Sequence, residues 1–339
     1  MSKDSGTGRA PNLRDVARLA GVSHQTVSRV LNHHPSLRPS TEERVLRAME
    51  TLHYRPNRAA RMLVTSRSRT IGVLAAASGS YYGPASSING IEDAARAAGY
   101  YVSIANLDAF ERESITAAVD HLMAQAVEGI VIIAPQTRVS DAIAELSLGV
   151  PFVTLQSAHS ADRHTMMVDQ SAGAQSAMQH LIDLGHRHIL HLAGPQDWFE
   201  AEARLRGYLT ALESSGLQRM EPVFGDWTAD FGYHAGRELV LRRDFTAVFS
   251  SNDQMALGLI HAFHEAGRSI PSDISVVGFD DIPEAAHFWP PLTTVRQDFA
   301  LLGKRSIALL LRELEDGTNS NKDAIVPELI VRESAAPAA

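Results

Sequence analysis

The sequence predicts an α/β protein with a small all-helical segment at its N-terminus, and three observations support this. Short runs of β-branched and apolar residues alternate with helix-length amphipathic segments through residues 70–332. Residues 1–56 contain short amphipathic patterns with helix caps and a glycine turn, and no strand-like run. The chain has 339 residues, which exceeds one ordinary core, so we expect more than one domain.

Charge is distributed unevenly along the chain. The net charge is -8, but residues 1–69 contain 13 Lys and Arg against 5 Asp and Glu, a local charge of +8. The remaining residues therefore carry -16. A basic segment on an acidic body favours contact with phosphates, although a basic tail can also serve only as a solubilising arm.

The composition excludes several classes of protein. The chain has no Cys, which rules out disulfides, thiolate metal sites and cysteine nucleophiles, and fits a reducing cytoplasm. Its first residues are polar, and no apolar run approaches the roughly 20 residues of a membrane-spanning helix. We therefore expect a cytoplasmic protein without membrane contact.

Two short helices joined by a tight turn are predicted over residues 13–20 and 23–32. Asn12 is a good N-cap for the first helix, Gly21 ends it, and Ser23 caps the second. This succession of helix, glycine turn and helix is the pattern of a helix-turn-helix. The second helix, SHQTVSRVLN, has one apolar side and one polar side, and the polar side suits a DNA major groove in size.

A third helix is expected to follow and to complete a minimal core. Ser40 or Thr41 would cap it, and Glu42 and Glu43 would lie in its first turn, where the helix dipole favours anions. Its buried stripe is predicted to consist of Val45, Ala48, Met49 and Leu52.

The segment LRDVARLAGVSHQTVSRVLN, followed by YRPNRAARML, resembles the DNA-binding headpiece of the lac repressor family. The resemblance implies that the second helix enters the major groove of double-stranded operator DNA. Arg can read guanine and Gln can read adenine, whereas short hydroxyl and amide groups suit phosphates. By this resemblance the base-facing residues are His24, Gln25 and Arg29, the residues near phosphates are Ser23, Thr26, Ser28 and Asn32, and the interface extends to Tyr54, Asn57 and Ala60. A merely solvated face would explain the polarity of this helix but not the position of Gln25 and Arg29 directly after the turn.

The segment RPNRAARMLV, residues 55–64, predicts a helix of only about two turns, too short to be stable alone in water. In the family this is the hinge helix, which pairs with its twin at the dimer axis and inserts a leucine into the minor groove. The matching residue here is Leu63, and such insertion unstacks a base step and bends the DNA. An ordinary linker is the alternative, but linkers are usually richer in Gly, Ser and Pro. We assign residues 1–56 to the headpiece and 57–69 to the hinge helix and linker.

Residues 70–332 contain the strand-like runs IGVLA, YVSIA, GIVII, PFVTL, HILHLAG, AVFSS and ISVVGF. Helical stretches between them imply parallel sheets with right-handed crossovers, in two doubly wound halves. Ligands of such sheets bind beyond the carboxyl ends of the strands. The polar, aromatic and turn residues expected there are Ala76 to Tyr82, Pro135, Gln156, Pro195 to Trp198, Asn252, Asp253, Asp280 and Asp281.

The segments GDW, SSNDQMALG, DISVVGFDD and PPLTTVRQDFALLG resemble the core of the same family. The resemblance implies a fold of the periplasmic-binding-protein type, with two doubly wound subdomains, three crossovers and a sugar between them. The expected N-subdomain comprises about residues 70–168 and 299–326. The expected C-subdomain comprises about 169–298 and 327–332, and residues 333–339 are expected to form a flexible tail.

The resemblance also implies a set of effector-binding residues. The positions that match the family pocket are Arg204, Trp227, Asn252, Asp280, Gln297 and Phe299, to which Ala76, Gln156, Trp198 and Glu200 are added from neighbouring strand ends. Charged and amide groups bind vicinal hydroxyls, and aromatic rings cover the apolar face of a pyranose. Each residue alone has a structural alternative: Asp280 as a helix cap, Trp227 as core, Arg204 as the partner of a nearby acid.

Two pocket positions depart from the lac branch of the family. Gln156 stands where that branch has an acidic residue, and Glu200 stands where it has a small serine. These departures weaken the case for a plain galactoside. Tyr81, Tyr82 and Trp198 add stacking surface for a larger or different saccharide.

Enzyme motifs are absent, so we expect no enzyme activity, no cofactor and no metal. The segment from Gly303 to Ser306 lacks the glycine of a phosphate-binding loop, because Asp298 occupies that position. His186, His188 and His191 resemble metal ligands in spacing, but they begin a strand and suit polar capping roles. Asp280 and Asp281 are two carboxylates, as in the acid and base pair of glycosidases, yet sequence neighbours on a loop usually point apart.

We therefore expect a transcriptional repressor of a carbohydrate-utilisation operon. It would bind a pseudo-palindromic operator as a homodimer and be released by a sugar inducer, galactoside-like or another small saccharide. The C-terminal AAPAA has no leucine heptad, so a coiled-coil tetramer is not expected. Two alternatives remain: a co-repressor-dependent regulator, as in the purine branch, or a cytoplasmic sugar-binding receptor without DNA function.

Overall fold

The computed structural model describes residues 11–31, 37–55, 62, 67–76, 81–107, 111–144, 146, 148–155, 164–316 and 324–338. The chain divides into two compact units, Met1–Ser68 and Arg69–Ala339, which we call the headpiece unit and the core unit. Within the described ranges, no helix combines the length and the apolar character needed to cross a bilayer.

The described part of the headpiece unit has the helices α1 (Leu13–Ala20), α2 (His24–Leu31) and α3 (Pro39–Thr51). α1 begins with a capping box between Asn12 and Asp15 and ends at Gly21, whose φ of 63° is left-handed. The hydroxyl of Ser23 accepts a hydrogen bond from the backbone N–H of Thr26 at 3.1 Å, and so caps α2. The predicted caps of the first two helices are confirmed.

A small apolar cluster holds the three helices together. Its buried members are Val16, Ala17, Ala20, Val27, Val30, Val45 and Ala48, with Met49 and Leu52 packed against them. The predicted cap of α3 is wrong, because the N-cap is Arg38 rather than Ser40 or Thr41. Pro39 takes the first helical position, where its missing N–H costs nothing and its fixed φ suits a helix, so the helix starts earlier than expected.

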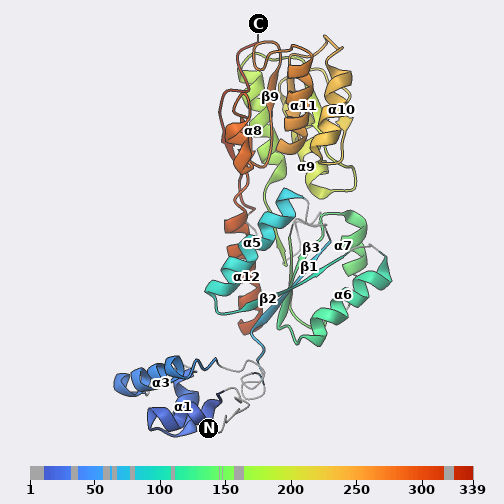
Figure 1. Ribbon diagram of the computed structural model, residues 1–339. Helices are drawn as coiled ribbons and strands as arrows, with labels where there is room; N and C mark the ends of the chain where they lie inside the picture. Colours follow the sequence, from blue (N-terminus) through green and yellow to red (C-terminus); the bar gives the residue numbers. More distant parts are fainter. Residues whose placement is uncertain are drawn as a thin grey trace, which may run out of the picture. The chain divides into compact units, whose positions relative to one another are not determined.

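One half of the core unit, which we call the N-subdomain, is a parallel sheet with the strand order β2-β1-β3-β4-β5. Its strands are β1 (Thr70–Ala75), β2 (Tyr101–Asn106), β3 (Gly129–Ile133), β4 (Phe152–Leu155) and β5 (Thr165–Met166). Its helices are α5 (Tyr82–Ala97), α6 (Arg112–Ala124), α7 (Thr137–Ala144) and α12 (Phe299–Asp316). α5 and α12 cover one face of the sheet, and α6 and α7 cover the other (Figure 1).

Side chains of the central strands alternate between these two helical layers. On β1, Ile71 and Val73 pack toward α5 and α12, whereas Leu74 packs toward α6 and α7. α5 and α12 approach closely at Gly90 and Gly303, because a Cβ on Gly303 would overlap the backbone of Gly90. This contact fixes α12, which arrives from the other half of the core unit, against the N-subdomain.

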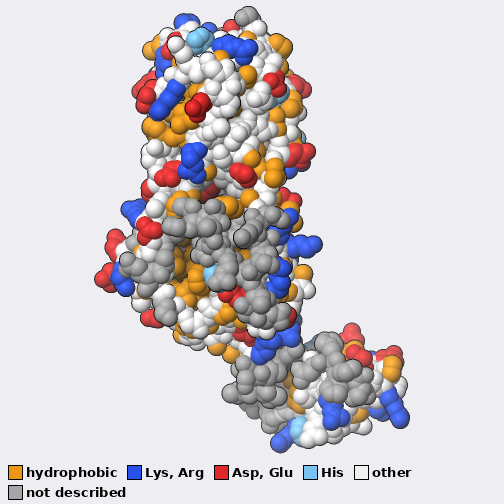
Figure 2. Space-filling model, turned by 180° about the vertical axis from the view of Figure 1, so that it is seen from behind, with side chains coloured by type: hydrophobic (Ala, Val, Ile, Leu, Met, Phe, Trp, Pro, Cys, Tyr) orange, Lys and Arg blue, Asp and Glu red, His pale blue; other side chains and the backbone are white. Residues whose placement is uncertain are grey.

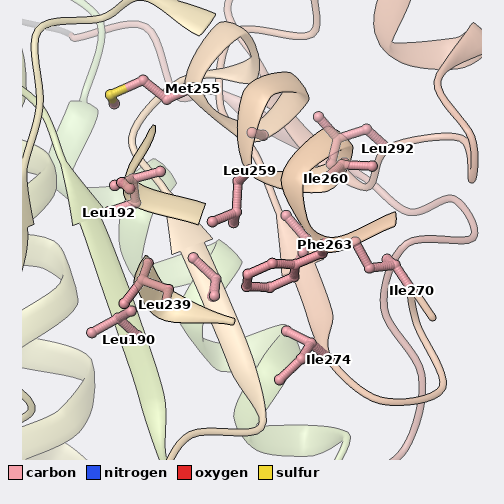
Figure 3. Packing of buried hydrophobic residues seen from close by; sticks show 14 of the residues in the cluster. Leu190, Leu192, Leu239, Met255, Leu259, Ile260, Phe263, Ile270, Ile274 and Leu292 are labelled. Atoms are coloured by element: carbon pink, nitrogen blue, oxygen red, sulfur yellow. The ribbon is translucent and has the colours of Figure 1, made fainter. Parts of the chain in front are cut away.

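The other half, the C-subdomain, is a parallel sheet with the strand order β7-β6-β8-β9. Its strands are β6 (Ile189–Ala193), β7 (Val223–Phe224), β8 (Ala247–Ser250) and β9 (Ser275–Val277). Its helices are α8 (Gln170–Asp183), α9 (Phe199–Ser214), α10 (Ala229–Leu239), α11 (Asp253–Glu265) and the 3-10 helix η1 (Pro283–His287). α8 and α9 share one apolar cluster with the sheet, and α10 and α11 share another. Figure 3 shows Leu259 and Phe263 of α11 within the second cluster, near Leu190 and Leu192 of β6.

The chain crosses between the subdomains three times. The crossings lie between β5 and α8, between β10 (Thr294–Arg296) and α12, and between Ile325 and β11 (Glu328–Ile330). β10 and β11 pair antiparallel beside α8, and Ile325 bridges to Val168 next to β5. The predicted fold class, two doubly wound subdomains joined by three crossovers, is confirmed.

The prediction of a flexible C-terminal tail is wrong for residues 333–338. Ser334 is fully buried, its hydroxyl donates to Val276 O at 2.6 Å, and its carbonyl accepts from Val276 N at 2.7 Å. Ala338 donates to Leu184 O. β9 is an edge strand of the sheet, and its backbone groups need partners, so the polar and small residues after β11 bind there.

Charged residues are mixed on the surface of the core unit. Figure 2 shows acidic and basic side chains interspersed on one of its faces. The exposed ion pair of Arg242 with Asp244, at 2.8 Å, is typical of this surface. Exposed pairs contribute only about 0–1 kcal/mol each, so the stability of the unit rests on its apolar clusters.

Candidate functional sites

α2 exposes the polar side that its sequence predicts. Val27 and Val30 are buried in the headpiece cluster, which turns the opposite face of the helix outward. The exposed residues of the predicted interface are Ser23, His24, Gln25 and Arg29, and the partly exposed ones are Thr26 and Ser28. This face presents Arg and Gln side chains next to short hydroxyl groups, so α2 is the candidate nucleic-acid interface.

Of the other predicted DNA-binding residues, Tyr54 alone lies within the described ranges. Tyr54 is partly buried against the headpiece cluster, and its backbone N–H donates to Met49 O at 2.8 Å after the end of α3. The remaining four, Asn32, Asn57, Ala60 and Leu63, lie outside the described residues. The hinge helix and its leucine wedge therefore stay predictions.

A cavity of about 310 Å³ lies between the two subdomains, at the carboxyl ends of strands from both sheets. We call it the inter-subdomain cavity. Eight of the predicted effector-binding residues line it: Trp198, Glu200, Arg204, Trp227, Asn252, Asp280, Gln297 and Phe299. Its size is within the range of small-molecule sites, and its position follows the rule for ligands of open parallel sheets.

Aromatic rings form the apolar wall of the cavity. Tyr81 of the N-subdomain meets Trp198 edge to face, with ring centroids 5.1 Å apart, and Trp198 meets Trp227 in the same way at 5.8 Å. Tyr82 and Phe299 form a further edge-to-face pair at 5.8 Å. Rings from both subdomains thus enclose one space and offer it flat apolar faces.

A closed network of buried hydrogen bonds forms the polar side. Arg204 donates from Nε to Gln170 Oε1 at 2.9 Å, from Nη1 to Ser251 O, and from Nη2 to Asp280 Oδ1 at 3.3 Å. Gln170 donates to Gln297 Oε1 at 2.7 Å, and Gln297 donates to Asp280 Oδ1 at 2.7 Å. The guanidinium also lies 3.9 Å from the ring centroid of Phe279. The network holds Arg204, Asp280 and Gln297 at the cavity in fixed positions.

Backbone strain is concentrated beside this network. Asp280 has a backbone φ of 111° and Trp227 has a φ of 74°, values that residues other than glycine rarely adopt. Asp281, at φ 51°, turns away and pairs with Arg296 at 2.7 Å and Arg332 at 2.6 Å. The neighbouring carboxylates therefore point apart, as predicted, and do not form an acid–base pair. Burial raises the pKa of Asp280, and the adjacent Arg204 opposes this shift.

Asn252 lines the cavity, but its side chain is already used within the protein. Its Oδ1 caps α11 by accepting from Met255 N at 2.9 Å, and its Nδ2 donates to Trp227 O at 2.9 Å. Asp253 is buried behind it and accepts from Thr294 Oγ1 at 2.6 Å and Ile282 N at 2.9 Å. Asn252 therefore positions Trp227 as well as facing the cavity.

Two buried polar atoms of the cavity residues have no hydrogen-bond partner in the described part of the chain, namely Glu200 Oε2 and Trp227 Nε1. Burial raises the pKa of Glu200 to about 7, although Arg204 on the same helix favours its ionised form. Buried polar groups are normally paired, so these two atoms are candidates for contact with a ligand.

The remaining two predicted effector residues are Ala76 and Gln156. Ala76 is fully buried in the cluster between the N-subdomain sheet and α6–α7, so its prediction is corrected: the side chain packs inside the subdomain. Gln156 lies outside the described residues. Sequence reasoning also missed Gln170, a member of the Arg204 network, because a Gln at the start of a helix carries no signal of its own.

The histidines that resembled metal ligands have structural partners. His186 Nδ1 lies 2.8 Å from Thr246 Oγ1, and its Nε2 lies 3.0 Å from Ala336 O. His191 stacks between Tyr208 and Phe249, with ring centroids 4.9 and 4.8 Å away, and burial lowers its pKa to about 4. Within the described ranges no group of three or more His, Asp and Glu is arranged to hold a metal ion.

Comparison with known proteins covers both units of the chain. Residues 12–57 match the model of bacterial regulatory proteins of the lacI family, and residues 178–335 match that of a periplasmic binding protein-like domain. The lactose operon repressor of Klebsiella pneumoniae is 34% identical over 333 residues, which cover 98% of this chain and 94% of the repressor. The chain belongs to the lacI family.

Solved structures agree with this lacI-family assignment. The lac repressor dimer bound to operator and the anti-inducer ONPF superposes with a TM-score of 0.84 at 33% identity, over 97% of this chain and 100% of that one. A complex of the transcriptional regulator CelR with cellobiose gives a TM-score of 0.71 at 32% identity, over 96% and 100%. The family that the headpiece and core motifs resemble is confirmed.

Proposed function

We propose that this lacI-family protein is a DNA-binding transcriptional repressor of a carbohydrate-utilisation operon, and that a sugar in the inter-subdomain cavity controls its affinity for the operator. The observation that carries the proposal is the combination of two sites in one chain. One is the exposed polar face of α2, and the other is a cavity with aromatic walls and a buried polar network.

The proposed binding to DNA is supported by α2. Arg29 and Gln25 are exposed on the second helix of a helix-turn-helix, where such side chains reach guanine and adenine in the major groove. A single short helix reads only a few base pairs. Two copies of the chain related by a two-fold axis would read the two halves of a palindromic operator.

The proposed binding of a sugar is supported by the chemistry of the cavity. The rings of Trp198, Trp227 and Phe299 offer flat apolar faces, while Arg204 and Asp280 offer charged donors and acceptors. Pyranose rings have an apolar face and a rim of hydroxyls, so this combination suits a saccharide. The structure of CelR with cellobiose, in the same fold, supports a sugar as the class of ligand.

Control would operate through the two subdomains. The cavity is lined from both of them, and three crossovers connect them, so a sugar favours the arrangement in which both sets of groups contact it. We propose that this arrangement is the one that binds operator less well, which makes the sugar an inducer. Sugar and operator then favour different arrangements of the protein, so the binding of either one lowers the affinity for the other.

Intrinsic fluorescence offers a direct test of the ligand half. The chain has three Trp, of which Trp198 and Trp227 line the cavity and Trp289 is 82% exposed. In a Trp289→Phe protein all the indole emission comes from the cavity. We expect one sugar of a panel of lactose, cellobiose and ribose to change that emission in a saturable way. Saturable changes with purines and none with sugars would contradict the proposal.

DNA binding is tested on a pool of duplexes that are randomised independently on the two sides of a central CG step. We expect the full chain to enrich one palindromic sequence over repeated rounds of selection. A protein that enriches no sequence, or only one half-site, would contradict the dimeric repressor.

A further inference from the structure

We propose that Glu200 sets the charge class of the ligand: a neutral saccharide whose hydroxyls donate hydrogen bonds to the Glu200 carboxylate, to the exclusion of sugar phosphates and sugar acids. This inference rests on the proposed function, because it concerns the same cavity. It assigns to Glu200 a role in specificity that goes beyond general contact with a sugar.

The carboxyl of Glu200 is held at the edge of the cavity by the start of α9. Glu200 is the second residue of that helix, one turn before Arg204, and both side chains line the cavity. The residue as a whole is only partly buried, but its Oε2 atom is buried and has no hydrogen-bond partner in the described part of the chain. A carboxylate oxygen in that situation lacks the donors that it would have in water.

Arg204 does not supply the missing partner, because other groups occupy it. Its guanidinium donates to Asp280, to Ser251 O and to Gln170, and Asp280 at 3.3 Å balances its charge. The ionised form of Glu200 therefore adds a negative charge beside the buried ion pair of Arg204 and Asp280, which is already neutral. A second anion brought in by a ligand would face both Glu200 and Asp280 at close range, and among the described residues that line the cavity Arg204, already paired, is the one cation.

Trp227 supplies the complementary half of the recognition. Its indole Nε1 is buried without a partner in the described residues, and an indole N–H can only donate, whereas a carboxylate can only accept. A sugar hydroxyl can do both. Hydroxyls of one neutral saccharide can thus donate to Glu200 and accept from Trp227, which satisfies both atoms with one kind of group.

The same geometry couples ligand binding to protons. Burial holds the pKa of Glu200 at about 7; a hydrogen bond from its own backbone N–H and the charge of Arg204 on α9 favour its ionised form, and Asp280, in the loop after β9, opposes it. Hydroxyls that donate to the carboxylate stabilise its ionised form and lower this pKa, so binding releases a proton near neutral pH. Affinity for the sugar should therefore rise as the pH increases through about 7.

Calorimetry on the full chain tests the inference, with a matched variant on the same helix. Glu200→Gln keeps the shape of the side chain and removes its charge. Glu202→Gln makes the same change on a residue that pairs with Arg206 at 3.8 Å and does not line the cavity. Titrations use lactose, cellobiose and ribose, and as anionic probes lactobionate, cellobionate and ribose 5-phosphate, at about pH 6 and pH 8. Thermal melts of each variant establish that it is folded.

For the wild type and Glu202→Gln we expect one neutral sugar to bind about tenfold more tightly at the higher pH, with proton release. Its anionic counterpart should bind at least about a hundredfold more weakly. Glu200→Gln should lose the pH dependence and tolerate the anion at least about tenfold better. A wild type that prefers the anionic sugar, or a folded Glu200→Gln protein with unchanged pH dependence, would overturn the role of Glu200 while leaving the sugar-controlled repressor intact. If neither charge class of sugar binds, the proposed function itself fails.

Discussion

Arg204 is the residue around which the polar side of the cavity is organised. It is 4% exposed, and its charge is balanced by Asp280 within a ring of side-chain hydrogen bonds that also includes Gln170 and Gln297. A buried ion pair adds little net stability, but breaking one leaves an uncompensated charge. The network thus serves mainly to hold groups in position for a ligand.

Replacing Asp280 by Asn should weaken sugar binding strongly. Arg204 would remain buried without its counter-charge, and truncating one member of a buried hydrogen-bonded pair costs about 2–5 kcal/mol, so the Kd should rise by at least about 30-fold. Asp281→Asn is the matched control, because that carboxylate pairs with Arg296 and Arg332 away from the cavity. Fluorescence titration of both variants checks this, and equal losses of affinity would contradict the assigned role of Asp280.

His191 should make the protein less stable in mild acid. Its pKa is about 4 in the folded chain against an ordinary 6.5, because it is buried in its neutral form. Between these values the unfolded chain binds a proton that the native chain does not, so stability falls as pH drops from 6.5 toward 4, by roughly 3 kcal/mol in all.

Urea unfolding at several pH values measures this contribution. His191→Phe keeps an aromatic ring between Tyr208 and Phe249 and should reduce the loss of stability across that window. The exposed His188, changed to Gln, should leave the pH dependence as in the wild type. A His191→Phe protein with the wild-type slope would show that another group titrates.

At the scale of elements, α2 should account for the choice of operator sequence. Arg29→Ala removes the exposed Arg of that helix and should lower operator affinity by about 1–3 kcal/mol, or roughly 5- to 150-fold, and relax specificity at one base pair. Arg47→Ala removes the same charge from α3, where Arg47 pairs with Glu43. Fluorescence anisotropy with the selected duplex checks both variants, and the assignment of α2 fails if they weaken binding equally.

One added methyl group where α5 and α12 cross should lower the stability of the protein. Gly303→Ala places a Cβ against the backbone of Gly90, which cannot move aside as a flexible side chain would. Overpacking of this kind costs about 1–3 kcal/mol and should lower the Tm by several degrees. Lys304→Ala, at the neighbouring exposed position, should change the Tm little in the same calorimetric scan. A Gly303→Ala protein with the Tm of the wild type would contradict the close contact between α5 and α12.

Local patterns in the sequence predicted most elements, and long-range contacts explain why the docked tail and Gln170 were missed. The caps at Asn12 and Ser23 depend only on residues one turn away, so they were predictable. The docking of Ser334 on β9 depends on which strand lies at the sheet edge, which the tail sequence does not reveal. The link between Gln170 and Arg204 likewise depends on how α8 and α9 pack, 34 positions apart in the chain. The cavity residues Trp198, Arg204, Trp227 and Asp280 were predictable through the family resemblance and the ends of strands.

For the whole molecule, the central claim is that the cavity and α2 are coupled. Family membership spans both units, and the cavity is lined by both subdomains of the core unit. If sugar weakens operator binding by a given factor, operator must weaken sugar binding by the same factor. Such couplings are typically 1–3 kcal/mol, or about 5- to 150-fold.

The most direct test measures the Kd of the full chain for its selected palindromic duplex, by fluorescence anisotropy, without sugar and with a saturating amount of the sugar that binds the cavity. We predict that saturating sugar raises this Kd by about tenfold or more, and that Asp280→Asn requires far more sugar for the same effect. An operator Kd that the bound sugar leaves unchanged, or lowers, would contradict the account of this protein as a sugar-induced repressor.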